Sequence, residues 1–150
     1  MSADKVKSKF LSNSELEQVM NAIAEAERAT SGEIRVHLES HCDKDPFGRA
    51  TEVFSKLRME RTALRNGVLI YVAAHDHQFA IIGDQGINDA VSNGFWEATR
   101  DAMIMHFKNG RFCEGLCAGL QAAGQALSKY FPYQGTKDVN ELSDEISEGH

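Results

Sequence analysis

The chain has 150 residues, of which 42% are hydrophobic and 25% are charged, so it fits one domain with a single core. Its net charge of −6 argues against a broad nucleic-acid-binding face, which requires clustered Lys and Arg. The longest apolar run, residues 67–74, is far too short to span a bilayer, and we expect no membrane insertion.

The cysteine content and the first residues indicate a compartment. Three cysteines, an odd number, provide no disulfide framework. The N-terminal residues contain no apolar core of a signal peptide. We therefore predict a reducing, cytoplasmic location.

The first third of the chain predicts a helix followed by a strand. Residues 12–15 (Ser-Asn-Ser-Glu) have the pattern of a capping box, and the apolar stripe that follows ends near Ala26. After Gly32, residues 33–39 alternate strictly between apolar and polar side chains. This alternation predicts a strand whose polar face is partly exposed.

The middle third predicts a helix and a pair of strands. Asp45 and Pro46 have the residue types of an N-cap and a first helical position, for a helix that we expect to end near Glu60. Residues 68–74 are apolar at nearly every position, as in a central strand covered on both faces. Residues 78–82 follow after a short turn, which predicts an antiparallel hairpin. The strand–helix–strand order before it predicts a parallel, right-handed crossover.

The last third predicts two helices and a tail. Helical spacing covers residues 95–107 and 112–130, and Pro132 closes the second helix. Residues 133–150 carry a net charge of −4 and few apolar residues, so we predict an acidic, disordered tail. We expect a flexible segment at residues 1–11 and one domain at residues 12–132. The predicted fold is a three-layer αβα sandwich of the α/β class, in which about four helices flank a small mixed sheet.

Several short motifs occur in a characteristic order. They are Thr30-x-Gly32-Glu33-Ile34-Arg35-Val36, Asn66-Gly67-Val68-Leu69-Ile70-Tyr71-Val72, Phe79-Ala80-Ile81-Ile82-Gly83-Asp84-x-Gly86-Ile87, Phe95-Trp96, His106-Phe107-x-x-Gly110-x-Phe112-x-x-Gly115-Leu116 and Tyr130-Phe131-Pro132. From about Ser12 to Pro132, the chain resembles the TPM-domain family, the thylakoid-lumen-phosphatase-like domain, as a soluble member of the bacterial type.

This resemblance implies a compact αβα sandwich with a small mixed sheet. It further implies one of three roles, because members of the family include acid phosphatases, proteins that bind calcium or other divalent ions, and accessory or assembly factors. Many relatives carry an acidic Asp-x-x-Gly-type motif before the first helix, whereas this chain has Phe10-Leu11-Ser12-Asn13 there. A metal or phosphatase site that uses the missing acid is therefore not carried over.

The predicted hairpin sorts the polar residues onto two rims of the sheet. If residues 78–82 run back, Asp84 lies beside Asn66 at the start of the partner strand, and Glu33 starts the parallel strand on the same rim. The polar set there is Glu33, Arg65, Asn66, Asp84, Gln85 and Asp89. Such oxygen ligands suit Ca²⁺ or Mg²⁺, and we assign Asp84, Glu33 and Asp89 as metal ligands. The alternative is that Asp84 caps a turn or a short helix while Glu33 is a solvated strand end.

The opposite rim holds a second candidate site. Its predicted members are Glu39, Asp43, Asp45, His75 and His77, with His41, Cys42 and Asp76 nearby. Ligands of open α/β sheets bind at the carboxyl ends of parallel strands, and these residue types bind zinc. The alternative is a set of exposed loop histidines, because i and i+2 spacing in a tight turn is not an established ligand pattern.

Two functions remain, the first supported by the residues and the second implied mainly by the family resemblance. The first is a metal-binding accessory or protein-interaction module, consistent with the lack of a recognisable nucleophile. The second is a metal-assisted acid phosphatase, in which Arg65 and Asn66 hold the substrate phosphate and the ion activates water. The sequence leaves the natural ligand, the protein partner and the oligomeric state open.

Overall fold

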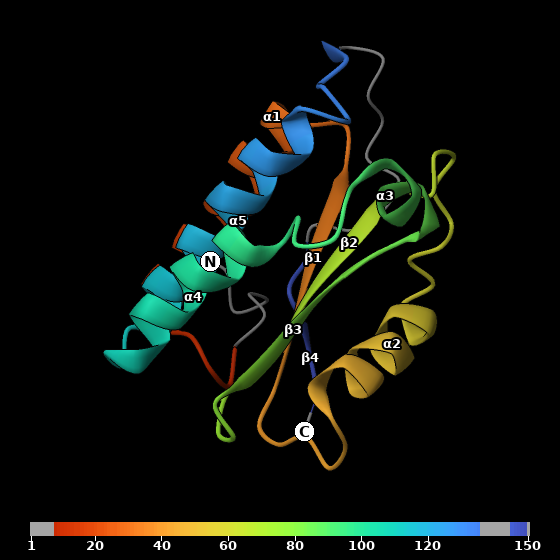
Figure 1. Cartoon of the computed structure of the whole chain (residues 1–150). Coiled ribbons are helices and arrows are strands. Elements are labelled where there is room, and N and C mark those ends of the chain that lie inside the picture. Colours follow the sequence, from red (N-terminus) through yellow and green to blue (C-terminus); the bar gives the residue numbers. More distant parts are fainter. Residues whose placement is uncertain (1–7, 136–144, 150) are drawn as a thin grey trace.

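The computed structural model describes residues 8–135 and 145–149. They form three layers, in which one mixed sheet lies between helices on its two faces (Figure 1). In that part of the chain the elements are α1 (Asn13–Ala29), β1 (Glu33–Glu39), α2 (Pro46–Lys56), β2 (Gly67–Ala73), β3 (Gln78–Gly83), α3 (Gln85–Ala90), α4 (Glu97–Lys108), α5 (Phe112–Ser128) and β4 (Ser147–Glu148). Helices α1, α4 and α5 lie on one face of the sheet and α2 on the other, which confirms the predicted αβα sandwich.

The strand directions confirm the predicted crossover and hairpin. The sheet order is β3-β2-β1-β4, with β1 parallel to β2 and β3 antiparallel to β2. Glu33 lies opposite Gly67, and Val68 lies opposite Gly83. The starts of β1 and β2 and the end of β3 therefore share one rim.

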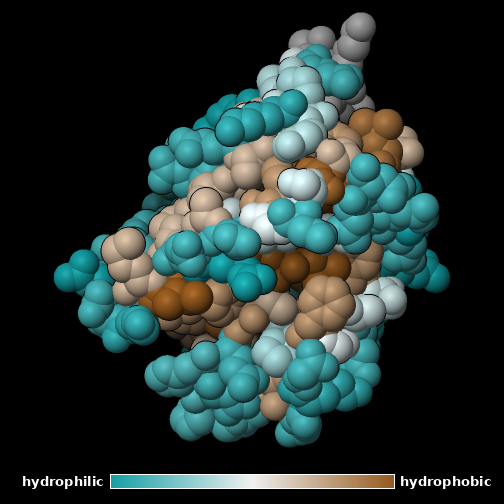
Figure 2. Space-filling model, in the orientation of Figure 1, coloured by the Kyte–Doolittle hydropathy of each residue, from teal (hydrophilic) through white to brown (hydrophobic). Residues whose placement is uncertain are grey.

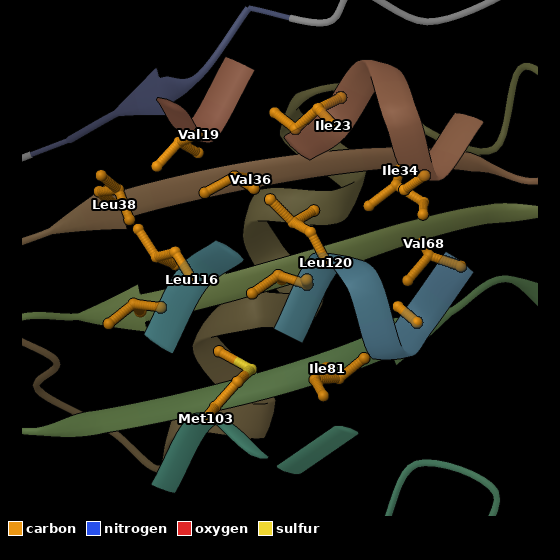
Figure 3. Packing of buried hydrophobic residues seen from close by; sticks show 14 of the residues in the cluster. Val19, Ile23, Ile34, Val36, Leu38, Val68, Ile81, Met103, Leu116 and Leu120 are labelled. Carbon is orange, nitrogen blue, oxygen red and sulfur yellow. The ribbon is translucent and has the colours of Figure 1, made fainter. Parts of the chain in front are cut away.

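Alternating side chains of the strands supply two cores. Ile34, Val36 and Leu38 of β1 point toward α1 and α5, where they meet Ile23 and Leu120 (Figure 3). The opposite faces of β2 and β3 pack against α2 in a second, smaller cluster that includes Leu69, Tyr71 and Phe54. Because β2 is buried at every position, both faces of the sheet contribute apolar area.

Local signals set the helix starts. The Ser12 hydroxyl accepts from the Glu15 amide at 3.1 Å, and the Glu15 carboxylate accepts from the Ser12 amide at 3.0 Å, which completes the predicted capping box. Asp45 caps α2 by accepting from the Gly48 amide at 3.1 Å. This helix ends at Lys56, before the expected Glu60, because the chain turns into the left-handed region at Arg58 (φ 56°).

The predictions for the two ends of the chain need a correction. Residues 1–7, 136–144 and 150 lie outside the described residues. Disorder is the wrong prediction for residues 145–149, because Ser147–Glu148 pairs with the free edge of β1 and Ile146 packs against the core. Leu11, which we assigned to the flexible N-terminal segment, is buried. The edge of β1 thus supplies backbone hydrogen bonds that composition does not reveal.

The visible surface is mixed in character. Figure 2 shows hydrophilic residues over most of this face, with smaller hydrophobic areas between them. The exposed large hydrophobic residues come from several elements, among them Met20 of α1, Phe47 of α2 and Met105 of α4. Within residues 8–135 and 145–149, the helices are too short or too polar to cross a membrane.

Candidate functional site

The Asp84 rim consists of Ser31, Glu33, Arg65, Asn66 and Asp84, where β1 and β2 begin and β3 ends. The Asp84 carboxylate accepts from Arg65 Nε at 2.8 Å and from Arg65 Nη2 at 3.0 Å. It also accepts from the Gln85 amide at 2.7 Å and caps α3, which confirms the capping part of the alternative. The other part, Glu33 as a solvated strand end, is wrong because Glu33 is buried. This bidentate pair raises the pKa of Arg65.

Close backbone packing holds Arg65 beside Asp84. Arg65 itself has φ 50°, in the left-handed region. The Gly86 amide donates to the Arg65 carbonyl at 2.8 Å, and a Cβ on Gly86 would lie 2.1 Å from the Leu64 carbonyl oxygen. Glycine is required at this position because the first turn of α3 lies directly against the loop that carries Arg65 and Asn66.

Two buried oxygen atoms on this rim have no hydrogen-bond partner. Asn66 Nδ2 donates to the Ser31 carbonyl at 3.1 Å, which fixes the orientation of the amide and turns Oδ1 away. Within the described residues, buried side-chain oxygens without a partner are Ser31 Oγ, Asn66 Oδ1 and Thr99 Oγ1, so two of the three lie here. Each such group costs about 1–3 kcal/mol. A cation or an ordered water at this rim would remove that cost.

The other predicted ligands of this rim are placed differently. Glu33 is buried, at 6% exposure, whereas Asp89 and Gln85 are exposed on α3. Residues 8–135 and 145–149 contain no group of three or more His, Cys, Asp or Glu side chains that could hold a metal ion. Asp84, Glu33 and Asp89 are thus not a ready-made carboxylate cluster, and their role as ligands stays a prediction.

The Glu39 rim lies at the opposite end of the sheet and is centred on Glu39, Arg49, Tyr71 and His37. The Glu39 carboxylate, 3% exposed, accepts from Arg49 Nε at 2.8 Å and Nη2 at 3.0 Å. The Tyr71 hydroxyl and His37 Nε2, at 3.0 Å, complete its donors. Burial opposes ionisation of Glu39, but these hydrogen bonds outweigh it and lower the pKa to about 2.

The prediction of a partly exposed polar face on β1 holds at Arg35, which is partly exposed, and is wrong for the other three polar side chains of the strand. Glu33 and His37 are each 6% exposed, and Glu39 less still. Arg49 of α2 covers Glu39, and Ser147 of β4 covers His37. Burial lowers the pKa of His37 below its ordinary 6.5, despite the hydrogen bond to Glu39.

Sequence reasoning missed three members of this network, namely Arg49, Tyr71 and His37. Tyr71 lies in the apolar run of residues 68–74, but a tyrosine hydroxyl needs a hydrogen-bond partner when it is buried. The Tyr71 hydroxyl and the acid Glu39 at the end of β1 were the signal in the sequence that indicated this network. Burial raises the pKa of Tyr71, and its hydrogen bond to Glu39 acts in the same direction.

Other residues near the second candidate site form contacts between the loop after β1 and the loop after β2. Asp76 accepts from the Cys42 amide at 2.7 Å and from His41 Nδ1 at 2.9 Å, which ties the two loops together. The rings of His41 and His75 meet edge to face at 4.8 Å.

Other predicted members of the second candidate site line two different surface hollows. One, of about 560 Å³, is lined by Glu39, His41, Asp43, Lys44, Arg49 and Glu52. The other, of about 330 Å³, is lined by His77 together with apolar residues that include Phe10 and Phe107. Glu39 and Asp43 therefore share a hollow, whereas Asp45 caps α2 and His77 lies apart. A zinc site here stays a prediction.

The fold and its two polar rims define a small open-sheet α/β domain. The TPM domain family model matches residues 5–126, and the chain belongs to that family. No curated protein matches the sequence.

Solved structures agree with this membership. The BA42 protein of the psychrophilic bacterium Bizionia argentinensis is 50% identical, with a TM-score of 0.88 over 97% of this chain and 99% of that one. An N-terminal domain from P. gingivalis is 25% identical, with a TM-score of 0.66 over 82% of this chain and 80% of that one. The N-terminal domain of the cg2496 protein from Corynebacterium glutamicum is 14% identical, with a TM-score of 0.62 over 99% and 94%, and supports the fold alone.

Proposed function

We propose that this TPM domain is a calcium-binding accessory module, with the cation held at the Asp84 rim. The observation that carries the proposal is the pair of buried oxygens without partners, Ser31 Oγ and Asn66 Oδ1, on the same rim as a buried carboxylate. Hydroxyl, amide and carboxylate oxygens are the ligands of hard cations. Ca²⁺ is favoured over Mg²⁺ because Mg²⁺ demands stricter octahedral geometry.

Calcium binding requires the Asp84 carboxylate to release the Arg65 guanidinium and to bind the cation instead. The Arg65 side chain is 46% exposed, so it can move into solvent when a cation takes its place. The Asp84 contact to the Gln85 amide leaves the second carboxylate oxygen for the ion. Glu33, buried nearby on β1, would supply further negative charge, and Asp89 would contribute through water.

Calcium would make the rim a regulated surface for a protein partner. Exchange of Arg65 for a cation at the start of α3 changes the charge that this end of the domain presents. We place the module in the cytoplasm, because Cys42, Cys113 and Cys117 are all free thiols.

The test is thermal unfolding of the full chain with and without calcium. Calcium at about 100 times its Kd stabilises a folded protein by about 2.7 kcal/mol, which raises Tm by about 5–10 °C for a domain of this size. Asp84→Asn keeps an acceptor for the helix cap and removes the charge, so we expect it to abolish the shift. Ser31→Ala removes an oxygen without a partner, so we expect a smaller calcium shift and a higher calcium-free Tm, because the cost of the unsatisfied hydroxyl is gone.

Asp76→Asn is the matched control. Asp76 also accepts from a backbone amide and a basic side chain, but it lies on the Glu39 rim. We expect the calcium response of this variant to equal that of the wild type. An unchanged Tm of the wild type in millimolar calcium, or equal responses of Asp84→Asn and wild type, would contradict the proposal.

Metal-assisted phosphatase activity is the second candidate. It is favoured by the half-exposed Arg65 guanidinium, which lies beside Asp84 and could hold a phosphate next to a bound ion. Asn66 Nδ2 would be a further donor on the same rim. Arg65→Gln separates the two functions: calcium affinity should rise because a competing cation is gone, whereas phosphate-ester turnover should fall. Equal turnover by wild type and Asp84→Asn would exclude the enzyme.

A further inference from the structure

A short segment of the chain itself occupies the free edge of β1. Ser147 and Glu148 form β4, parallel to β1, opposite His37 and Leu38. The Gly149 amide adds one backbone hydrogen bond to the Leu38 carbonyl at 2.8 Å. A pairing this short has few backbone bonds, so the side chains determine where the segment sits.

The first two positions of the segment, Ile146 and Ser147, have specific surroundings. Ile146 packs against the core cluster between the sheet and α1. The Ser147 hydroxyl lies 2.8 Å from His37 Nδ1. His37 Nε2 faces the ionised Glu39, which can only accept, so Nε2 carries the proton and Nδ1 accepts from Ser147. The position therefore requires a hydroxyl donor.

The next two positions, Glu148 and Gly149, are equally restricted. The Glu148 carboxylate accepts from the Lys9 amide at 3.0 Å and from the Ser8 hydroxyl. A Cβ on Gly149 would lie 2.7 Å from Glu39 Oε1 and 3.2 Å from His37 Nε2. Glu39 is held by its own hydrogen bonds and cannot yield, so only glycine fits here.

We propose that the edge of β1 is a peptide-binding groove that selects an extended Ile-Ser-Glu-Gly segment in parallel register. The occupant is a strand of a partner protein with this order of side chains: branched apolar, hydroxyl, acid and glycine. Residues 146–149 are the resident competitor, which a partner strand displaces by strand addition. Because the resident segment is tethered, its effective concentration is high, and binding in the wild type is correspondingly weak.

The test uses the full chain and a fluorescent peptide of sequence Asp-Glu-Ile-Ser-Glu-Gly-His, which copies residues 144–150. Gly149→Val drives the resident segment off the groove through the clash with Glu39. In fluorescence anisotropy, this variant should bind the peptide at least about tenfold more tightly than the wild type does. Amide NMR shifts should appear at His37 and Leu38.

Two altered peptides test whether the groove selects the serine and the glycine of the segment. Replacement of the peptide serine by alanine should weaken binding about tenfold, because His37 Nδ1 loses its donor. Replacement of the glycine by valine should abolish binding. Ser147→Ala in the protein repeats the comparison with a milder change if Gly149→Val proves unstable. Equal binding by wild type and both variants, or equal binding of a scrambled peptide, would overturn the proposal.

Discussion

The two rims of the sheet both hold a buried acid beside an arginine, but they satisfy it in opposite ways. Glu39 accepts from Arg49, Tyr71 and His37, so the protein itself supplies its donors. On the Asp84 rim, one arginine and one amide serve the acid, while two neighbouring oxygens lack a donor. The Glu39 network acts as a structural joint between β1, β2 and α2. The Asp84 rim keeps capacity for a ligand.

This contrast runs against the usual rule for open α/β sheets, in which ligands bind at the carboxyl ends of parallel strands. Here Glu39 lies at that end, and its bonding capacity is already used. The oxygens without donors belong to Ser31 and Asn66, which lie just before β1 and β2. Because β3 runs antiparallel to β2, Asp84 at its end lies on the same rim. Buried oxygens that lack hydrogen-bond donors, rather than the direction of the strands, identify the better candidate site.

Breaking the Glu39 network should have the largest effect on stability. Glu39→Ala leaves Arg49, Tyr71 and His37 without their shared acceptor in a buried place. Loss of one partner of a buried ion pair costs about 3–5 kcal/mol, which urea unfolding can measure. Asp101→Ala, an exposed acid of α4, is the control and should leave the midpoint unchanged. A Glu39→Ala variant as stable as this control would mean that the network is not a structural joint.

Gly86→Ala should come next and should act on the other rim. The new Cβ meets backbone oxygens of Leu64 and Arg65, which cannot move aside cheaply. We expect a loss of about 1–3 kcal/mol, as for overpacked cores. Because the shifted loop carries Asn66, the calcium response should be lost as well. Gln85→Ala, at the exposed neighbouring position, should preserve both properties.

Acid should weaken the Glu39 rim in two stages. The pKa of His37 is lowered by burial, so the unfolded chain takes up a proton near pH 6.5 before the folded protein does. Stability should therefore fall as pH drops below about 6.5, by at most about 1.4 kcal/mol per pH unit for one proton. Glu39, whose pKa is about 2 against an ordinary 4.5, adds a second loss below about pH 4.5.

The free energy of unfolding, measured against pH for the wild type and for His37→Gln, separates the contribution of His37 from that of Glu39. The variant should lack the slope that begins near pH 6.5 and keep the slope at lower pH. Equal profiles for the two proteins would mean that His37 is not held neutral by burial.

Much of the fold was predictable because its signals are local. The capping box at Ser12, the Asp45-Pro46 helix start and the alternation in β1 each depend on neighbouring residues alone. The direction of β3 then placed Asp84 on the correct rim. These signals need no knowledge of side-chain packing.

What escaped prediction depends on contacts between distant residues. The Arg49–Glu39–Tyr71 network exists only once α2 has packed on the sheet. Strand β4 is too short to show a periodicity, and it pairs with residues about 110 positions away. The oxygens without donors, at Ser31 and Asn66, are likewise visible only in three dimensions.

A calcium titration followed by amide NMR of the uniformly labelled full chain tests the account most directly. We predict saturable shifts at Ser31, Asn66 and the first turn of α3, while Glu39, Cys42 and Asp76 stay unchanged. Saturable shifts confined to the Glu39 rim, or no shifts on either rim in millimolar calcium, would contradict the assignment of the cation site.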